Sequence, residues 1–128
     1  METVIVNQSR GNVVCKRTEI ADTLLRRMRG LLGRASLPAG DGMFFKGESS
    51  IHSAFMRFEF DAVFMDRDLR VVGLAERIPP WRARAAKGTR NILELAAGEI
   101  TRTGVAIGDQ LAVTEMREGH DTAETSAS

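Results

Sequence analysis

The stretch MFFKGESSIHSAFMRFEFDAVFM, residues 43–65, contains all six phenylalanines of the chain. Trp81 is the one other aromatic residue, and the chain has no tyrosine. Large aromatic side chains dominate the packing of a small core. We therefore expect the middle of the chain to form the centre of the interior. Its apolar residues predict three short strands, at 43–45, 51–58 and 60–65.

Five further apolar runs of strand type flank this centre. They lie at residues 4–6, 13–15, 70–78, 91–95 and 111–116. The turn chemistry of residues 9–12 and 66–68 predicts two β-hairpins. Pro79 and Pro80 end the strand before them, because neither can donate a hydrogen bond to a neighbouring strand. We expect residues 82–87 to form a basic connection without regular structure, and residues 96–103 to hold one helical turn that ends at Gly104.

One segment near the N-terminus has helical periodicity. Its apolar residues recur every three to four positions, at Ile20, Leu24, Leu25, Met28, Leu31 and Leu32. Arginines 26, 27 and 29 fall elsewhere on the helical wheel and form a solvated face. This spacing predicts an amphipathic helix over residues 20–32, with Thr18 or Asp22 as its cap and Gly33 at its end.

These elements predict a β-rich α+β domain. We expect a curved sheet, a sandwich or a partly closed barrel of about seven or eight short strands, with the one amphipathic helix near the N-terminus packed on it. A chain of 128 residues fits a single domain. We expect that domain to span residues 1–117 and the acidic tail, residues 118–128, to be disordered.

The composition excludes several classes of protein. Hydrophobic residues make up 43% and charged residues 27% of the chain, which is typical of a globular protein and not of a disordered chain or a rod. The net charge of +1 is too small for a nucleic-acid binder, and the apolar runs are too short to cross a membrane. Cys15 is the single cysteine and lies in a β-branched run, so we expect it to be buried. The N-terminus lacks the pattern of a signal peptide, and we expect a cytoplasmic monomer.

The chain lacks the short motifs that identify common active sites. It contains no phosphate-binding glycine-rich loop, no GxGxxG, no HExxH and no GxSxG. Its two histidines are His52 and His120, and the second lies in the tail. We therefore expect no metal site and predict no cofactor.

Three ionisable residues stand within apolar runs, and each has a structural and a functional interpretation. His52 is either a half-buried histidine that bonds to backbone, which we favour, or a binding or proton-transfer residue. Asp61 would either pair with Arg57 or Arg34 or accept backbone N–H bonds at a bend, and we favour a structural role. Glu94 is either an outward residue on a sheet with one wet face, which we favour, or a catalytic group.

A basic segment follows the two prolines. Arg57, Arg82, Arg84, Lys87 and Arg90 would form a rim at one end of the sheet. Trp81 would either offer a stacking surface there or fill the core, and we favour the second interpretation. Arginine binds carboxylates and phosphates through two parallel hydrogen bonds, so a small anionic ligand is plausible.

An ordered series of motifs resembles the DUF192 family of domains of unknown function. It begins with RGLLGR at residues 29–34 and GMFF at 42–45, continues with SIHSAFMRF at 50–58 and FDAVFMD at 60–66, and ends with ILELAAG at 92–98 and GVAIGD at 104–109. The branch that it resembles has Ile-His before the Met-Arg pair. The resemblance implies a compact, mainly β fold with a helix near its start and implies no established activity.

Three hypotheses for function remain open. We prefer a non-enzymatic binding or accessory module for a small polar or anionic ligand, with a cleft at one mouth of the sheet lined by Arg34, His52, Met56, Arg57, Asp61 and Trp81. The second is a small hydrolase or isomerase that uses His52 as general base, oriented by Asp61 or Glu94. The third is a protein-interaction domain that docks an unidentified partner through its arginine-rich helix face or its acidic tail.

Overall fold

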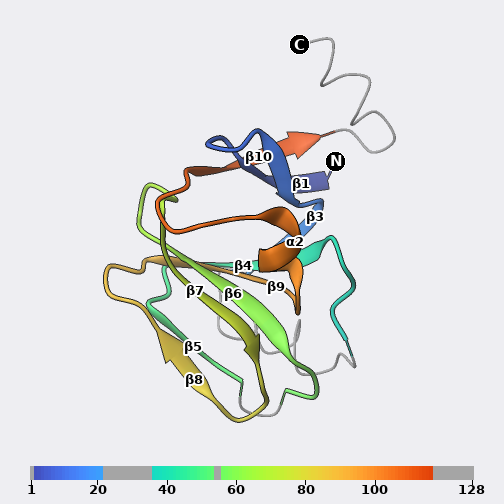
Figure 1. Cartoon of the computed structure of the whole chain (residues 1–128), viewed down its shortest axis with the longest axis vertical. Helices are drawn as coiled ribbons and strands as arrows, with labels where there is room; N and C mark the ends of the chain where they lie inside the picture. Colours follow the sequence, from blue (N-terminus) through green and yellow to red (C-terminus); the bar gives the residue numbers. More distant parts are fainter. Residues whose placement is uncertain (1, 22–35, 54–55, 117–128) are drawn as a thin grey trace.

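The computed structural model describes residues 2–21, 36–53 and 56–116, and in these residues three open sheets form three layers (Figure 1). The middle layer is a five-stranded sheet. In spatial order its strands are β3 (Arg17–Ala21), β4 (Asp41–Lys46), β9 (Asn91–Ala96), β6 (Phe60–Met65) and β7 (Val71–Ile78). The β3–β4 pair is parallel, and the other pairs are antiparallel.

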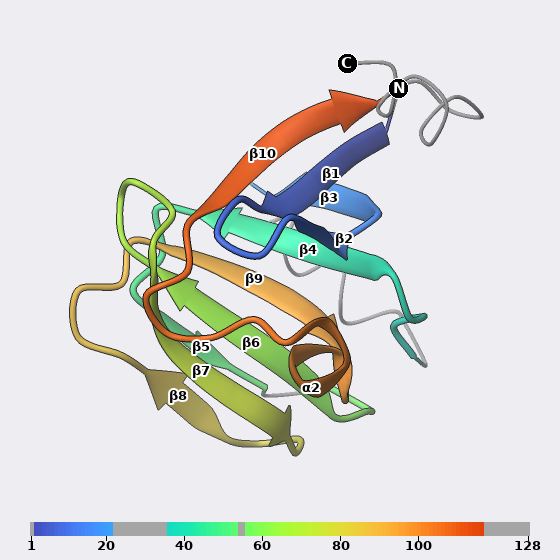
Figure 2. The same cartoon turned by 45° about the horizontal axis from the view of Figure 1, so that its top comes forward.

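The other two sheets lie on opposite sides of this middle sheet (Figure 2). One has three antiparallel strands in the order β10 (Leu111–Met116), β1 (Glu2–Asn7) and β2 (Asn12–Cys15). The other is a ribbon formed by β5 (Ser50–His52) and β8 (Ala83–Ala85). The short helix α2 (Glu99–Thr103) follows β9 and ends at Gly104, which adopts the left-handed conformation.

The core therefore has two halves, one on each face of the middle sheet. On one face, Val63, Leu93 and Leu95 pack with residues from the three-stranded sheet and α2, which are Ile5, Val14, Ile100 and Leu111. On the other face, Met43, Phe60 and Phe64 pack with Ile51 of the ribbon and with Met56. Every residue of β6 and β9 is buried, because both faces of these central strands are covered.

Most of the expected strands and both hairpins are confirmed, as is the helical turn before Gly104. A curved or layered sheet is consistent with the structure, but the partly closed barrel is wrong, because none of the sheets in the described residues closes. Ile20 and Ala21 were expected to begin the helix. They lie instead in β3, where pairing with β4 places Thr18 inside a strand and not at a helix cap. The rest of the predicted helix, from residue 22, and the acidic tail lie outside the described residues.

Two predictions for the ribbon are wrong. The strand expected over 51–58 ends at His52. The pairing becomes irregular at Ser53, whose N–H donates to the Arg82 carbonyl while its own carbonyl accepts the N–H of Trp81. Residues 83–85 of the expected irregular connection pair with β5. These three residues are all exposed, so β8 has no apolar alternation that could reveal it in the sequence.

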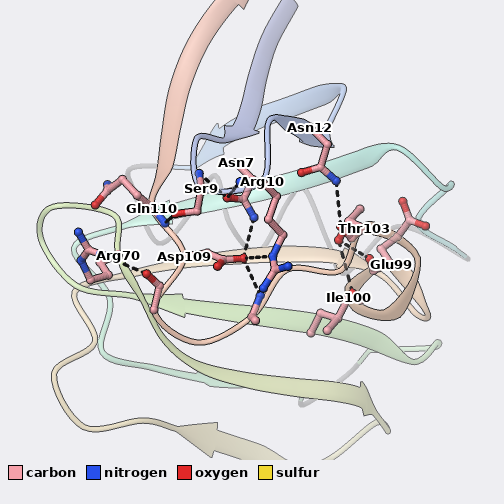
Figure 3. A network of polar contacts seen from close by, with 12 residues as sticks. Asn7, Ser9, Arg10, Asn12, Arg70, Glu99, Ile100, Thr103, Asp109 and Gln110 are labelled. Atoms are coloured by element: carbon pink, nitrogen blue, oxygen red, sulfur yellow. Dashed lines mark hydrogen bonds and ion pairs between the residues drawn. The ribbon is translucent and has the colours of Figure 1, made fainter.

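Asp109 joins the first hairpin to the loop that follows α2 (Figure 3). Its Oδ2 accepts hydrogen bonds from Asn7 Nδ2 at 2.8 Å, from Arg10 Nε at 2.6 Å and from the backbone N–H of Ala106 at 2.9 Å. Burial alone would raise the pKa of Asp109, but these three donors outweigh it and lower the pKa below its usual range. The carboxylate therefore stabilises the contact between two segments that are distant in the sequence.

No helix in the part of the chain that the structure describes is long and apolar enough to cross a membrane.

Replacing Asp109 with Asn should destabilise the fold. The amide oxygen can take the place of Oδ2 but carries no charge, so the charge-assisted bond from Arg10 is weakened, and we expect a loss of about 1–3 kcal/mol in the free energy of unfolding. Urea denaturation measures it. Asp68→Asn, at an exposed carboxylate in a turn, is the matched control and should change stability by less than about 0.5 kcal/mol. Equal losses in the two variants would contradict this role of Asp109.

Candidate functional site

The two carboxylates that were considered as partners of His52 do not share one site. Asp61 and Glu94 lie on the adjacent strands β6 and β9, but on opposite faces. Asp61 is paired with Leu95, which packs in the first half of the core, whereas Glu94 is paired with Ala62, which packs in the second. Since side chains alternate between the faces of a strand, these two carboxylates cannot line one cleft. Arg34 lies outside the described residues.

Asp61 is fully buried and has a structural role, as the sequence favoured. Its Oδ1 accepts the backbone N–H of Arg77 at 2.8 Å, and its Oδ2 accepts those of Gly98 at 3.1 Å and Ile100 at 3.0 Å. The carboxylate thus caps the start of α2 from a neighbouring strand, where Gly98 has no side chain to do so. The alternative pairing with Arg57 is not observed.

His52 and Arg57 are both exposed, while Met56 is buried in the second half of the core. The prediction that His52 is half-buried, which we favoured, is therefore wrong. Neither Asp61 nor Glu94 hydrogen-bonds His52, so within the described residues no carboxylate orients this imidazole as a general base would require.

Trp81 does not fill the core, so the interpretation that we favoured for this residue is wrong. The residue is 60% exposed, and its backbone has φ of 63°, a left-handed conformation that is uncommon for a tryptophan. Ser53, which is fully buried, fixes this conformation. The Trp81 N–H donates to the Ser53 carbonyl at 3.0 Å, the Ser53 hydroxyl donates to the Pro79 carbonyl at 2.6 Å, and the Arg82 N–H donates to that hydroxyl at 2.8 Å.

Ser53 could not be singled out from the sequence, because one serine in an apolar run has no distinguishing signal. Its importance depends on two segments that lie about thirty residues apart and meet only in the folded chain. We call this arrangement of Ser53 with residues 79–82 the Trp81 clamp.

The basic residues near the Trp81 clamp have no acidic partners among the described residues. Arg82 Nη1 donates to the Trp81 carbonyl at 3.0 Å, and Arg84 Nη1 donates to the Ala83 carbonyl at 2.8 Å. The ion pairs observed in the described residues use other cations, which are Arg10, Arg17, Arg77 and Arg102. The clamp therefore carries positive charge that no described carboxylate neutralises.

Glu94 is a buried acid without a hydrogen-bond partner, contrary to the outward position that we favoured. It is 1% exposed, and neither carboxyl oxygen has a partner among the described residues. Burial raises the pKa of Glu94 well above its usual value. An isolated buried carboxylate is far more costly than a neutral carboxylic acid, so we expect the protonated form to predominate over a wider pH range than for an exposed glutamate.

A separate open pocket of about 320 Å³ lies beside the parallel β3–β4 pair. It is lined by Glu2, Arg17, Thr18, Glu19, Asp41 and Gly42. Arg17 and Asp41 form an ion pair at its rim. Cys15 is fully buried nearby, where it packs against Gly42 as expected of a small apolar residue, and burial raises the pKa of its thiol. The described residues contain no group of three side chains arranged to hold a metal ion.

Comparison with known proteins identifies the family. The sequence profile of DUF192, described as an uncharacterised ACR, matches residues 5–113, and the chain belongs to this family. A UPF0127 protein of Thermococcus sibiricus is 33% identical over 113 residues, which cover 84% of this chain and 73% of that protein. A UPF0127 protein of Thermococcus gammatolerans is 30% identical over 124 residues, covering 90% and 79%.

Solved structures share the fold. A protein of unknown function from Novosphingobium aromaticivorans matches with a TM-score of 0.72 and 26% identity, over 86% of this chain and 82% of that one. A Sinorhizobium meliloti protein, whose description suggests a transcription regulator, matches with a TM-score of 0.73 over 87% of this chain and 91% of that one. Its identity of 24% supports the fold alone.

Replacing Ser53 with Ala should loosen the Trp81 clamp. The substitution removes the hydroxyl and leaves the Arg82 N–H and the Pro79 carbonyl without that partner, so we expect a loss of about 1–3 kcal/mol in the free energy of unfolding. Chemical denaturation measures the loss, and the exposed Ser49→Ala is the matched control. The indole N–H resonance of Trp81 should also shift in Ser53→Ala only. An unshifted resonance with unchanged stability would contradict the clamp.

The buried position of Glu94 predicts a specific pH dependence. Because its pKa is raised in the folded chain, the folded state binds the proton more tightly, and wild type loses stability relative to Glu94→Gln as pH rises above about 4.3. The difference in the free energy of unfolding between wild type and Glu94→Gln should grow by up to about 1.4 kcal/mol per pH unit, until Glu94 loses its proton in the folded chain. Denaturation of both proteins between pH 4 and pH 8 measures it. A gap that does not change with pH would show that Glu94 is not desolvated.

Proposed function

We propose that the chain is a non-enzymatic binding module for a small anionic ligand with a planar group, and that the Trp81 clamp is its binding surface. The observation that carries this proposal is the exposed indole, held by a buried serine in an uncommon backbone conformation. Such strain costs about 1–3 kcal/mol and persists where the surroundings enforce it, often at ligand-binding sites.

The charge around the clamp supports an anionic ligand. Arg82 and Arg84 follow Trp81 directly, and in the described part of the chain neither pairs with a carboxylate. A guanidinium can donate two parallel hydrogen bonds to a carboxylate or a phosphate, and aromatic side chains in general pack against planar groups. His52, on the exposed side of β5 opposite Ala83, adds a donor near the same segment.

This proposal keeps part of the site expected from the sequence. Trp81 and His52 remain candidate ligand-binding residues. Arg57 remains a prediction that no contact supports, and Met56 and Asp61 would act indirectly, through the core and through α2. We also propose that the protein acts as a cytoplasmic monomer without cofactors. A hydrolase or isomerase is less well supported, because His52 lacks an orienting carboxylate within the described residues.

The indole N–H signal of Trp81 tests the proposal, since this is the single tryptophan of the chain. Titration with phenyl phosphate should shift this NMR signal, and phenol, which has the same ring without the charge, should bind at least about tenfold more weakly. The double variant Arg82→Gln/Arg84→Gln should weaken phenyl phosphate binding by about tenfold or more, because charge-assisted hydrogen bonds are lost.

Arg67→Gln is the matched control, because Arg67 is an exposed arginine in the β6–β7 turn. It should leave the affinity unchanged. An indole signal that phenyl phosphate does not move, equal binding of phenol, or an equal loss in Arg67→Gln would each refute the anion-binding role.

A further inference from the structure

Glu94 is a polar group that the Trp81 clamp does not use. It lies in the middle of β9, between Met43 of β4 and Ala62 of β6, which are its partners in the sheet. The side chains on this face of the sheet belong to the second half of the core. The buried hydrophobic residues of this half are Ala21, Met43, Phe45, Ile51, Met56, Phe60, Ala62, Phe64, Ile78 and Ile92.

The neutral carboxyl group of Glu94 has one donor and one acceptor. Both oxygens are shielded from solvent, and neither has a hydrogen-bond partner in the described part of the chain. Buried polar groups in native proteins are nearly always paired, and each exception needs a physical explanation. A ligand that offers one acceptor and one donor side by side would satisfy both atoms of the carboxyl group.

We propose that Glu94 lies in a buried binding site, where its carboxyl group hydrogen-bonds to a small uncharged ligand. This ligand carries a carboxamide on an apolar body. The carbonyl of the amide accepts the O–H of Glu94, and its N–H donates to the other carboxyl oxygen. The apolar body lies among the methionine and phenylalanine side chains of this face. Met43 and Met56 have flexible, unbranched side chains that adapt to an inserted group.

The apolar surroundings of Glu94 favour an uncharged ligand. An ammonium or amidinium ligand would require an ionised Glu94 and would form an ion pair in an apolar environment, where desolvation offsets the attraction. A carboxylate or phosphate ligand would bring an unpaired charge into the same environment. A carboxamide places no charge in the core. This site is independent of the Trp81 clamp, whose proposed ligand is anionic.

Three probes of the same shape distinguish these classes. Benzamide is neutral, benzamidinium is a cation and benzoate is an anion. Each is titrated into the full chain at pH 6, with methyl NMR signals of methionine and alanine as the readout. We expect benzamide to shift the signals of Met43 and Ala62, and benzamidinium and benzoate to bind there at least about tenfold more weakly.

Two variants isolate the carboxyl group. Glu94→Gln keeps a neighbouring donor and acceptor without a titratable proton and should retain benzamide binding within about threefold. Glu94→Leu removes both polar atoms and should weaken binding at least about tenfold. Neither variant introduces a charge, so both are expected to fold, and thermal denaturation checks this. Glu115→Gln, on an exposed position of β10, is the control and should bind like wild type.

Three results would overturn the proposal. One is tighter binding of benzamidinium than of benzamide. Another is unchanged benzamide binding in Glu94→Leu. The third is the absence of any Met43 or Ala62 shift with millimolar benzamide, because the site would then be an internal acid that takes no ligand of this class.

Discussion

Coverage of the middle sheet on both faces is the constraint from which the rest of the structure follows. Its central strands, β6 and β9, are buried along their whole length. The three-stranded sheet and α2 cover one face, and the β5–β8 ribbon and Met56 lie over the other. Any polar side chain on these two strands must therefore find a partner, become neutral or receive a ligand. Asp61 and Glu94 meet this requirement in different ways.

Asp61 finds its partners in the backbone. Three N–H groups from the end of β7 and the start of α2 converge on its two oxygens. Asp109 has a comparable role farther along the chain, where it ties the first hairpin to the loop after α2. Both aspartates thus stabilise contacts between segments that are far apart in the sequence. Glu94 has no such partners in the described residues, which makes it the exception among the acids of the core.

Much of the fold could be predicted from the sequence, because its signals are local. The phenylalanines mark the core, the alternating runs mark the long strands, and Gly104 marks the end of α2. β8 could not be predicted, because its three exposed residues have no apolar pattern. The assignment of Ile20 and Ala21 was wrong, since apolar spacing alone does not distinguish the end of a strand from the start of a helix.

The candidate site was harder to predict, because it depends on contacts across the fold. The structural role of Asp61 was foreseen from the cost of burying an acid. The exposure of Trp81 was not, because it depends on the hydrogen bonds of Ser53 to residues about thirty positions later. The burial of Glu94 depends on which segments cover the second face of the sheet. The short apolar run around Glu94 does not show which segments these are.

Direct titration of Glu94 tests the central claim that the middle sheet is covered on both faces. The side-chain carboxyl carbon of each glutamate can be followed by carbon-13 NMR as pH is raised. If the sheet is covered as described, the Glu94 signal changes at a pH clearly above the ordinary range of a glutamate. A Glu94 signal that changes near the ordinary value of about 4.3 would show that water reaches this strand.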